Sequence, residues 1–157
     1  MNSLADEDLS LNEIFKICEK LCEENVINVA PIVGGRNSRI FRVETLEKVF
    51  ALKFYRLDKI DKMQRFEAET AALKIFEENG ISVTPKIIAE DRENNCTLLE
   101  WVEGDKVLEY GTTEIISLAK FVKNIHKISI NQNYRNVRDA TEACLNGNEI
   151  IIQIKNR

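Results

Sequence analysis

The order of three features constrains the fold of this chain most strongly: a glycine-rich turn, a lysine in an apolar strand, and an acidic residue on the helix beyond it. Gly34 and Gly35 lie in a predicted hairpin turn, where the missing Cβ atoms let backbone N–H groups approach phosphate oxygens. Lys53 closes the apolar segment Phe50-Ala51-Leu52-Lys53, and Glu69 lies in a predicted helix. Each feature alone is common, so their order and spacing carry the prediction of a phosphate-binding site.

Hydrophobic patterning predicts an α+β fold. The capping-box pattern Ser10-Leu11-Asn12-Glu13 starts an amphipathic helix, and a second, long helix over residues 61–79 stops at Gly80. Alternating and β-branched segments predict five strands, which we expect to form one antiparallel sheet. The predicted strands cover residues 26–33, 39–44, 49–55, 87–89 and 97–101, and the polar turn 93–95 joins the last two into a hairpin.

The segment after Gly104 differs in character, and this glycine is the predicted hinge. A further helix begins near Thr112, and a weaker helical pattern covers residues 141–156. The apolar stripe of the first of these helices consists of Ile115, Leu118, Ala119, Val122 and Ile125.

Composition excludes several classes of function. The chain of 157 residues carries 22 Lys and Arg against 26 Asp and Glu, so its net charge of −4 disfavours nucleic acids and anionic membranes. We expect a cytoplasmic protein, because the sequence contains neither a membrane-spanning apolar run nor a signal peptide. The four cysteines are predicted to be reduced thiols. Cys18 and Cys22 lie four residues apart, but a zinc site needs four ligands, so no metal site is predicted.

Four segments together resemble the N-terminal lobe of the aminoglycoside phosphotransferase and choline kinase-like superfamily. They are Gly34-Gly35-Arg36-Asn37-Ser38-Arg39-Ile40-Phe41-Arg42-Val43, Phe50-Ala51-Leu52-Lys53, Phe66-Glu67-Ala68-Glu69-Thr70-Ala71-Ala72-Leu73 and Leu98-Leu99-Glu100-Trp101-Val102-Glu103-Gly104. The resemblance implies a protein kinase-like N-lobe over residues 1–103, with a nucleotide site. It implies that residues 104–157 are a linker and the first helices of an incomplete second lobe.

The resemblance also implies a role for each residue of an ATP or GTP site. The turn formed by Gly34, Gly35, Asn37 and Ser38 would donate hydrogen bonds to the phosphates. Lys53 would neutralise phosphate charge, and Glu69, or alternatively Glu67, would hold the lysine in place. The walls of the base pocket would be Ile32, Ala51 and Leu99, and the backbone around Glu100, Trp101 and Val102 would read the edge of the base.

The catalytic half of such a site is missing from the sequence. A kinase-type catalytic loop reads His-x-Asp-x-x-x-x-Asn, but the single histidine, His126, is followed by Lys127 and Ile128. His126 is therefore predicted to be a packed or capping residue. We assign no catalytic residue and no metal ligand, and expect weak nucleotide binding without turnover. Magnesium is expected to bind only together with the missing lobe.

Two functions are consistent with these observations. The first is the nucleotide-binding part of an ATP- or GTP-dependent phosphotransferase that acts on a small hydroxylated molecule. The alternative is a non-catalytic interaction module, which forms a homodimer through the apolar face that a second lobe would cover. The sequence leaves open whether the acceptor is an aminoglycoside, choline, a sugar or a homoserine-like alcohol. It also leaves open the choice between ATP and GTP, and whether the chain is a fragment or a natural short product.

Overall fold

The computed structural model describes residues 9–32, 38–55, 64–104, 107 and 109–131. The predicted helix over residues 141–156 and Cys144 lie outside this part of the chain. The described elements, in chain order, are α1 (Leu11–Cys22), β1 (Val26–Ile32), β2 (Ser38–Thr45), β3 (Val49–Tyr55), α2 (Gln64–Glu78), β4 (Ile87–Asp91), β5 (Cys96–Glu100) and α3 (Thr112–Asn131).

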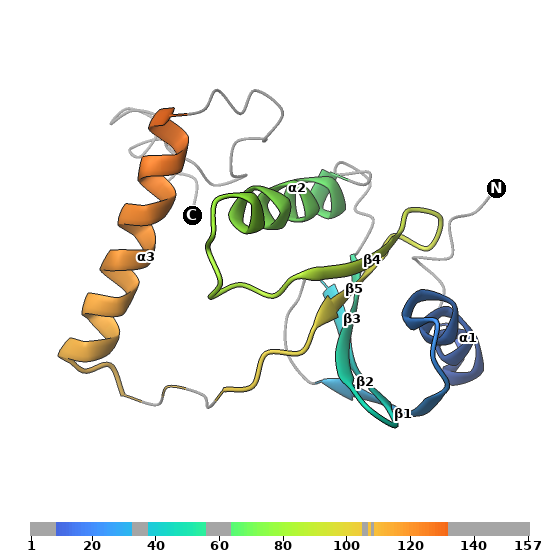
Figure 1. Ribbon diagram of the computed structural model, residues 1–157. Coiled ribbons are helices and arrows are strands. Elements are labelled where there is room, and N and C mark those ends of the chain that lie inside the picture. Colours follow the sequence, from blue (N-terminus) through green and yellow to red (C-terminus); the bar gives the residue numbers. More distant parts are fainter. Residues whose placement is uncertain (1–8, 33–37, 56–63, 105–106, 108, 132–157) are drawn as a thin grey trace, which may run out of the picture.

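The five strands form one antiparallel sheet in the order β1-β2-β3-β5-β4, so β3 is its central strand and β4 is an edge (Figure 1). Helix α2 lies over the sheet, and α1 lies beside it on the other side. This arrangement confirms the predicted α+β fold with an antiparallel five-stranded sheet and a long helix against it. Within the described residues, the predicted strand and helix positions agree with the observed ones to within a few residues.

Helix α1 covers one face of the sheet. Its N-terminus is capped as predicted, because the Ser10 side chain accepts from the Glu13 N–H and the Glu13 carboxylate accepts from the Ser10 N–H at 2.8 Å. The buried side chains of α1, Ile14 and Cys18, pack into the main core. The sheet side of this core is formed by Val26, Val29, Phe41, Val43, Phe50, Leu52, Phe54, Cys96 and Leu98.

Helix α2 covers part of the opposite face. Phe66 of α2 is fully buried, and its ring meets the ring of Tyr55 edge-on with the centroids 5.5 Å apart. The helix ends as predicted at Gly80, whose φ of +72° lies in the left-handed region. The Ile81 N–H donates to the Phe76 carbonyl at 2.9 Å, which is the hydrogen bond of a Schellman motif.

Helix α3 stands apart from the sheet in Figure 1 and approaches the end of α2, where the rings of Phe76 and Phe121 lie 6.2 Å apart. The predicted apolar stripe of this helix is not buried among the described residues. Leu118 is 62% exposed and Val122 is 55% exposed, because the helix instead turns Phe121 toward α2. None of the described helices is long and apolar enough to cross a membrane. Cys18, Cys22 and Cys96 are free thiols, as predicted.

Candidate functional site

Lys53 and Glu69 form a close ion pair between the central strand and α2. The Lys53 ammonium donates to both carboxylate oxygens of Glu69, at 2.7 and 2.6 Å. Strand alternation explains why Lys53 faces α2, since its neighbours Leu52 and Phe54 point into the core under α1. The lysine side chain is 19% exposed, so the cation is held in position while part of it stays accessible. The pairing that the sequence predicted is present.

Glu67 does not pair with Lys53, so this alternative is wrong. Its carboxylate contacts the Arg92 guanidinium at 3.3 Å instead. The reason is helical geometry: residues two apart are separated by about 200° around the axis, so Glu67 and Glu69 point to opposite flanks of α2.

Tyr55 lies beneath the ion pair and was not anticipated from the sequence. It follows Lys53 by two residues on the same face of β3, and its ring centroid lies 5.1 Å from the Lys53 ammonium. Its buried hydroxyl is 3.0 Å from the hydroxyl of Thr97 on β5. Burial and, after it, the nearby Glu69 carboxylate raise the pKa of Tyr55, so the phenol stays protonated. The i, i+2 spacing from Lys53 was the signal that could have revealed it.

The three predicted wall residues lie on the same sheet face as Lys53. Ala51 is paired directly with Leu99 across β3 and β5. Ile32 of β1 is paired with Ile40 of β2, which in turn is paired with Lys53. Leu99 is buried and Ile32 is 38% exposed, so the wall runs from the interior to the surface. Their function as a base pocket stays a prediction.

Arg42 and Trp101 add a second feature to this face. Arg42 is paired with Ala51, and its guanidinium lies over the Trp101 ring at 5.3 Å from the centroid. Arg42 also forms an ion pair with Glu44, and the Trp101 indole N–H donates to Glu103 at 2.9 Å. The sequence predicted Trp101 here but not Arg42, whose position depends on the strand register.

Part of the backbone that was predicted to read the base already forms a hydrogen bond within the protein. The Glu100 N–H donates to the Lys86 carbonyl at 2.9 Å, so this donor already has a partner within the hairpin. Recognition of a base edge would then fall to the backbone of Trp101 and Val102, next to the end of β5.

The glycine-rich turn itself is not described. Gly34, Gly35 and Asn37 lie outside the described residues, whereas Ser38 is the first residue of β2 and is paired with Tyr55. Within the part of the chain that the structure describes, no group of three or more His, Cys, Asp or Glu side chains gathers as a metal site. His126 is exposed on α3, so the packed alternative for this histidine is wrong.

A cavity among the described residues lies elsewhere. It has a volume of about 640 Å³ and lies between the end of α2 and α3, where Ile81 and Phe121 are among its lining residues. Lys53 and Glu69 do not line it. We place the candidate site at the ion pair, because it holds a charge beside a partly open sheet face. The volume of a cavity alone does not indicate which ligand chemistry it would bind.

The sequence was compared with those of known protein families, and one family matches. Residues 28–145 match the sequence profile of the phosphotransferase enzyme family, APH. Among the solved structures that match is a protein assigned as a fructosamine-3-kinase from Thermobifida fusca YX-ER1. The two sequences are 21% identical, and the TM-score is 0.48 over 62% of this chain and 34% of that chain. The chain thus spans about a third of the length of that structure. No curated protein matches the sequence.

Proposed function

Because the chain belongs to the phosphotransferase enzyme family, we propose that residues 1–103 form the nucleotide-binding lobe of an ATP- or GTP-dependent phosphotransferase. The observation that carries the proposal is the bidentate ion pair of Lys53 and Glu69, on the sheet face that also bears Ala51 and Leu99. A charged group beside an apolar strip matches a nucleotide, which joins a polyphosphate to a flat apolar base.

Lys53 would contact the phosphates as a point charge. A lysine has four rotatable bonds, so an unrestrained ammonium would lose much of its attraction to the entropy of being ordered. The two hydrogen bonds from Glu69 restrain that ammonium before a ligand arrives, which reduces this loss. A nucleotide would supply the phosphoryl group that members of the family transfer. The glycine-rich turn at residues 34–38 would provide backbone donors to the phosphates.

The acceptor would be a small hydroxylated molecule bound mainly by a second lobe, to which residues 104–157 would contribute the linker and first helices. The printed sequence contains no His-x-Asp-x-x-x-x-Asn motif to supply a base and a magnesium ligand. We therefore expect the 157-residue chain, tested by itself, to bind nucleotide without transferring phosphate.

Calorimetric titration of the purified chain with ATP and GTP, each with and without Mg²⁺, tests this function. We expect Lys53→Ala to weaken binding by roughly tenfold or more, because it leaves the Glu69 carboxylate facing the phosphates. Lys48→Ala is the matched control, since Lys48 also pairs with a glutamate, Glu24, at 2.7 Å, but this pair joins the β2–β3 turn to the loop between α1 and β1. Equal affinity in the wild type and Lys53→Ala would exclude the proposed phosphate contact.

A second candidate function is self-association through α3. Ile115, Leu118 and Val122 are each more than half exposed, and they lie on neighbouring turns of one helix. A homodimer that buried this stripe would make the chain an interaction module. Sedimentation equilibrium over a wide concentration range tests it: Leu118→Lys should lower the dimer fraction, and a wild-type chain that is monomeric throughout would exclude it.

A further inference from the structure

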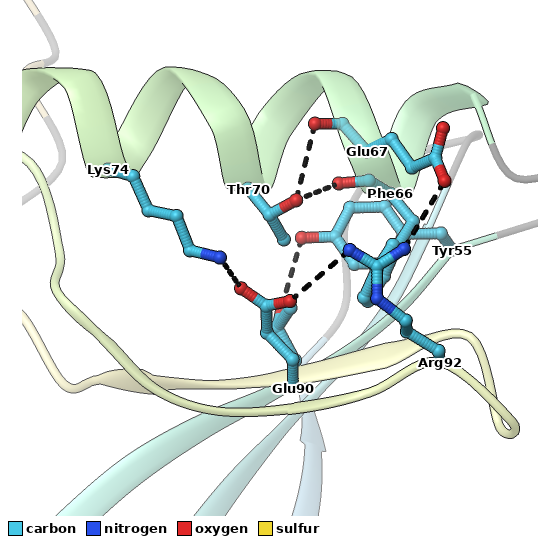
Figure 2. Close-up of polar contacts among 8 residues, drawn as sticks. Tyr55, Phe66, Glu67, Thr70, Lys74, Glu90 and Arg92 are labelled. Atoms are coloured by element: carbon cyan, nitrogen blue, oxygen red, sulfur yellow. Dashed lines mark hydrogen bonds and ion pairs between the residues drawn. The ribbon is translucent and has the colours of Figure 1, made fainter.

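Four charged residues link α2 to the edge strand β4. Lys74 of α2 lies 2.5 Å from Glu90 of β4, and Arg92, just beyond β4, lies 3.3 Å from Glu67 of α2. Arg92 also reaches Glu90, at 3.9 Å. Figure 2 shows Glu90 between Lys74 and Arg92, with α2 passing above all of them. We refer to Glu67, Lys74, Glu90 and Arg92 as the α2–β4 bridge.

The bridge and the Lys53–Glu69 pair lie on opposite flanks of α2. Phe66, Thr70 and Leu73 are the buried residues of this helix and define the side that faces the sheet. At about 100° per residue, Glu69 lies roughly 60° to one side of that line, whereas Glu67 and Lys74 lie roughly 80° to the other. A rotation of α2 that separated Glu69 from Lys53 would therefore also strain or break the bridge.

The strand order fits this two-sided attachment. Lys53 is on β3, the bridge attaches α2 to β4, and β5 lies between these two strands. Neighbouring strands are about 4.8 Å apart, so the two attachments are separated by roughly 10 Å across the sheet, which is close to the diameter of a helix. Glu67 and Lys74 are also about two helical turns apart along α2, so the bridge resists sliding as well as rotation.

A β-bulge aims the bridge at α2. Ile87 is paired with Leu99, but Ala89 is paired with Leu98, so an extra residue interrupts the register between them. Beyond the bulge, Glu90 shares the face of Thr97 and points toward α2, while Asp91 shares the face of Cys96 and contacts Lys20 of α1 at 3.2 Å. Without the extra residue, these two side chains would exchange faces.

Few apolar side chains of α2 are buried against the sheet, so the ion pairs of the bridge can contribute to holding the helix in place. Phe66 and Leu73 are the only large apolar side chains of its described residues that are buried, and the buried residue between them is the polar Thr70. The Thr70 hydroxyl donates back to the Phe66 carbonyl at 2.8 Å and so adds no bond to the sheet. Arg92 extends the contact by lying over the Phe66 ring, 5.5 Å from its centroid.

We propose that the α2–β4 bridge positions α2 so that Glu69 stays within bonding distance of Lys53, which makes Glu90 and Arg92 positioning residues of the nucleotide site. This rests on the proposed function only where nucleotide affinity is the readout. If the bridge is lost, α2 holds Glu69 in place for a smaller fraction of the time, and the apparent affinity falls by that fraction. For partly exposed ion pairs, we expect a threefold to tenfold loss.

The test compares Arg92→Gln, Glu67→Gln and the double variant with the wild type. Two readouts need no nucleotide: hydrogen exchange of the α2 amides, and the ¹⁵N signal of the Lys53 ammonium, whose protons exchange slowly while they are bonded to Glu69. The third readout is the dissociation constant for ATP. Urea unfolding monitors global stability, and Lys48→Ala is the control that removes an ion pair in which neither residue belongs to α2 or β4.

We expect Arg92→Gln to speed exchange in α2, weaken the Lys53 signal and reduce ATP affinity threefold to tenfold. The double variant should lose no more than Arg92→Gln alone, and Lys48→Ala should change none of these readouts. Unchanged α2 exchange and an unchanged Lys53 signal in Arg92→Gln would overturn the inference. If both respond while the wild type binds no ATP, the positioning is upheld and the proposed function fails.

Discussion

Two buried polar side chains, Tyr55 and Thr97, form a hydrogen bond below the candidate site. Tyr55 and Thr97 are 2% and 0% exposed, and their hydroxyls meet at 3.0 Å beneath the Lys53–Glu69 pair. A buried hydroxyl without a partner costs more than the bond itself contributes, so Thr97 needs the Tyr55 hydroxyl. The bond also fixes the Tyr55 ring, against which both Lys53 and Phe66 pack.

Removing the Tyr55 hydroxyl should therefore destabilise the protein. We expect Tyr55→Phe to lower the free energy of unfolding by about 1–2 kcal/mol, because Thr97 loses its buried partner. Urea denaturation measures the change. Tyr110→Phe is the matched control, since Tyr110 is 79% exposed and its variant should match the wild type. Equal losses in both variants would show that the buried bond has no special role.

At this scale, the sequence predicted the ion pair but not its surroundings. The resemblance to the phosphotransferase superfamily implied the pairing of Lys53 with Glu69, with Glu67 as the alternative. Arg42 and Arg92 could not be placed, since their partners depend on strand register and on the β-bulge in β4. A pattern of alternating side chains assigns residues to a face only while the register is unbroken.

At the end of α2, the backbone conformation of one residue determines where the helix stops. Gly80 has a φ of +72°, and the Gly80 N–H donates to the Glu77 carbonyl at 3.0 Å. The chain can then leave the helix and reach β4 at the position that the bridge requires. A Cβ atom at Gly80 would meet no other atom within 4 Å, so backbone strain is the sole cost of adding one.

Gly80→Ala should accordingly cost about 1–2 kcal/mol of stability, which is the cost of the left-handed conformation for a residue with a Cβ atom. Gly104→Ala serves as the comparison, because Gly104 also has open space but its φ lies outside the left-handed region. There we expect a change within about 1 kcal/mol, with stabilisation favoured by the reduced entropy of the unfolded chain. Thermal unfolding of both variants distinguishes strain from a general effect of losing a glycine.

Helix existence was easier to predict than helix packing. The capping box at Ser10 and the glycine at position 80 are local signals, and α1 begins and α2 ends where those signals lie. The stripe of α3 repeats with helical spacing, yet Leu118 and Val122 are exposed and Phe121 makes the contact with α2. Periodicity reports which side chains could be buried, whereas burial requires a surface that covers them.

Ionisable groups connect elements of the molecule, and among the described residues Glu13, Glu24 and Asp91 have carboxylate pKa values below the ordinary ones. Hydrogen bonds from Ser10 lower the pKa of Glu13, and a hydrogen bond from Lys48 lowers the pKa of Glu24, both below the ordinary value of 4.5. Burial opposes ionisation of Asp91, but hydrogen bonds from Asn94 and Lys20 outweigh it and bring its pKa below 3.8. Stability from such lowered pKa values is present above the ordinary values and is lost as the pH falls through the folded ones.

At high pH, stability is lost because two thiol pKa values are raised rather than lowered. Burial raises the pKa of the Cys18 thiol from 9.0 to about 12, and burial also raises the pKa of Cys96 above 9.0. The unfolded chain ionises these thiols first, so their contribution is intact below pH 9.0 and is lost as the pH rises toward the folded values. Stability should therefore be greatest between the ordinary carboxylate and thiol pKa values.

Urea denaturation under reducing conditions, at a neutral pH and again one unit above the ordinary thiol pKa, tests the alkaline limit. Each buried thiol should account for roughly 1 kcal/mol of lost stability, because the unfolded thiol is then mostly ionised and the folded one is not. Cys18→Ala lowers stability at neutral pH by leaving a small cavity, but it should reduce the loss between the two pH values by one thiol's share. If Cys18→Ala instead keeps the full loss, ionisation of Cys18 does not limit the alkaline stability of the molecule.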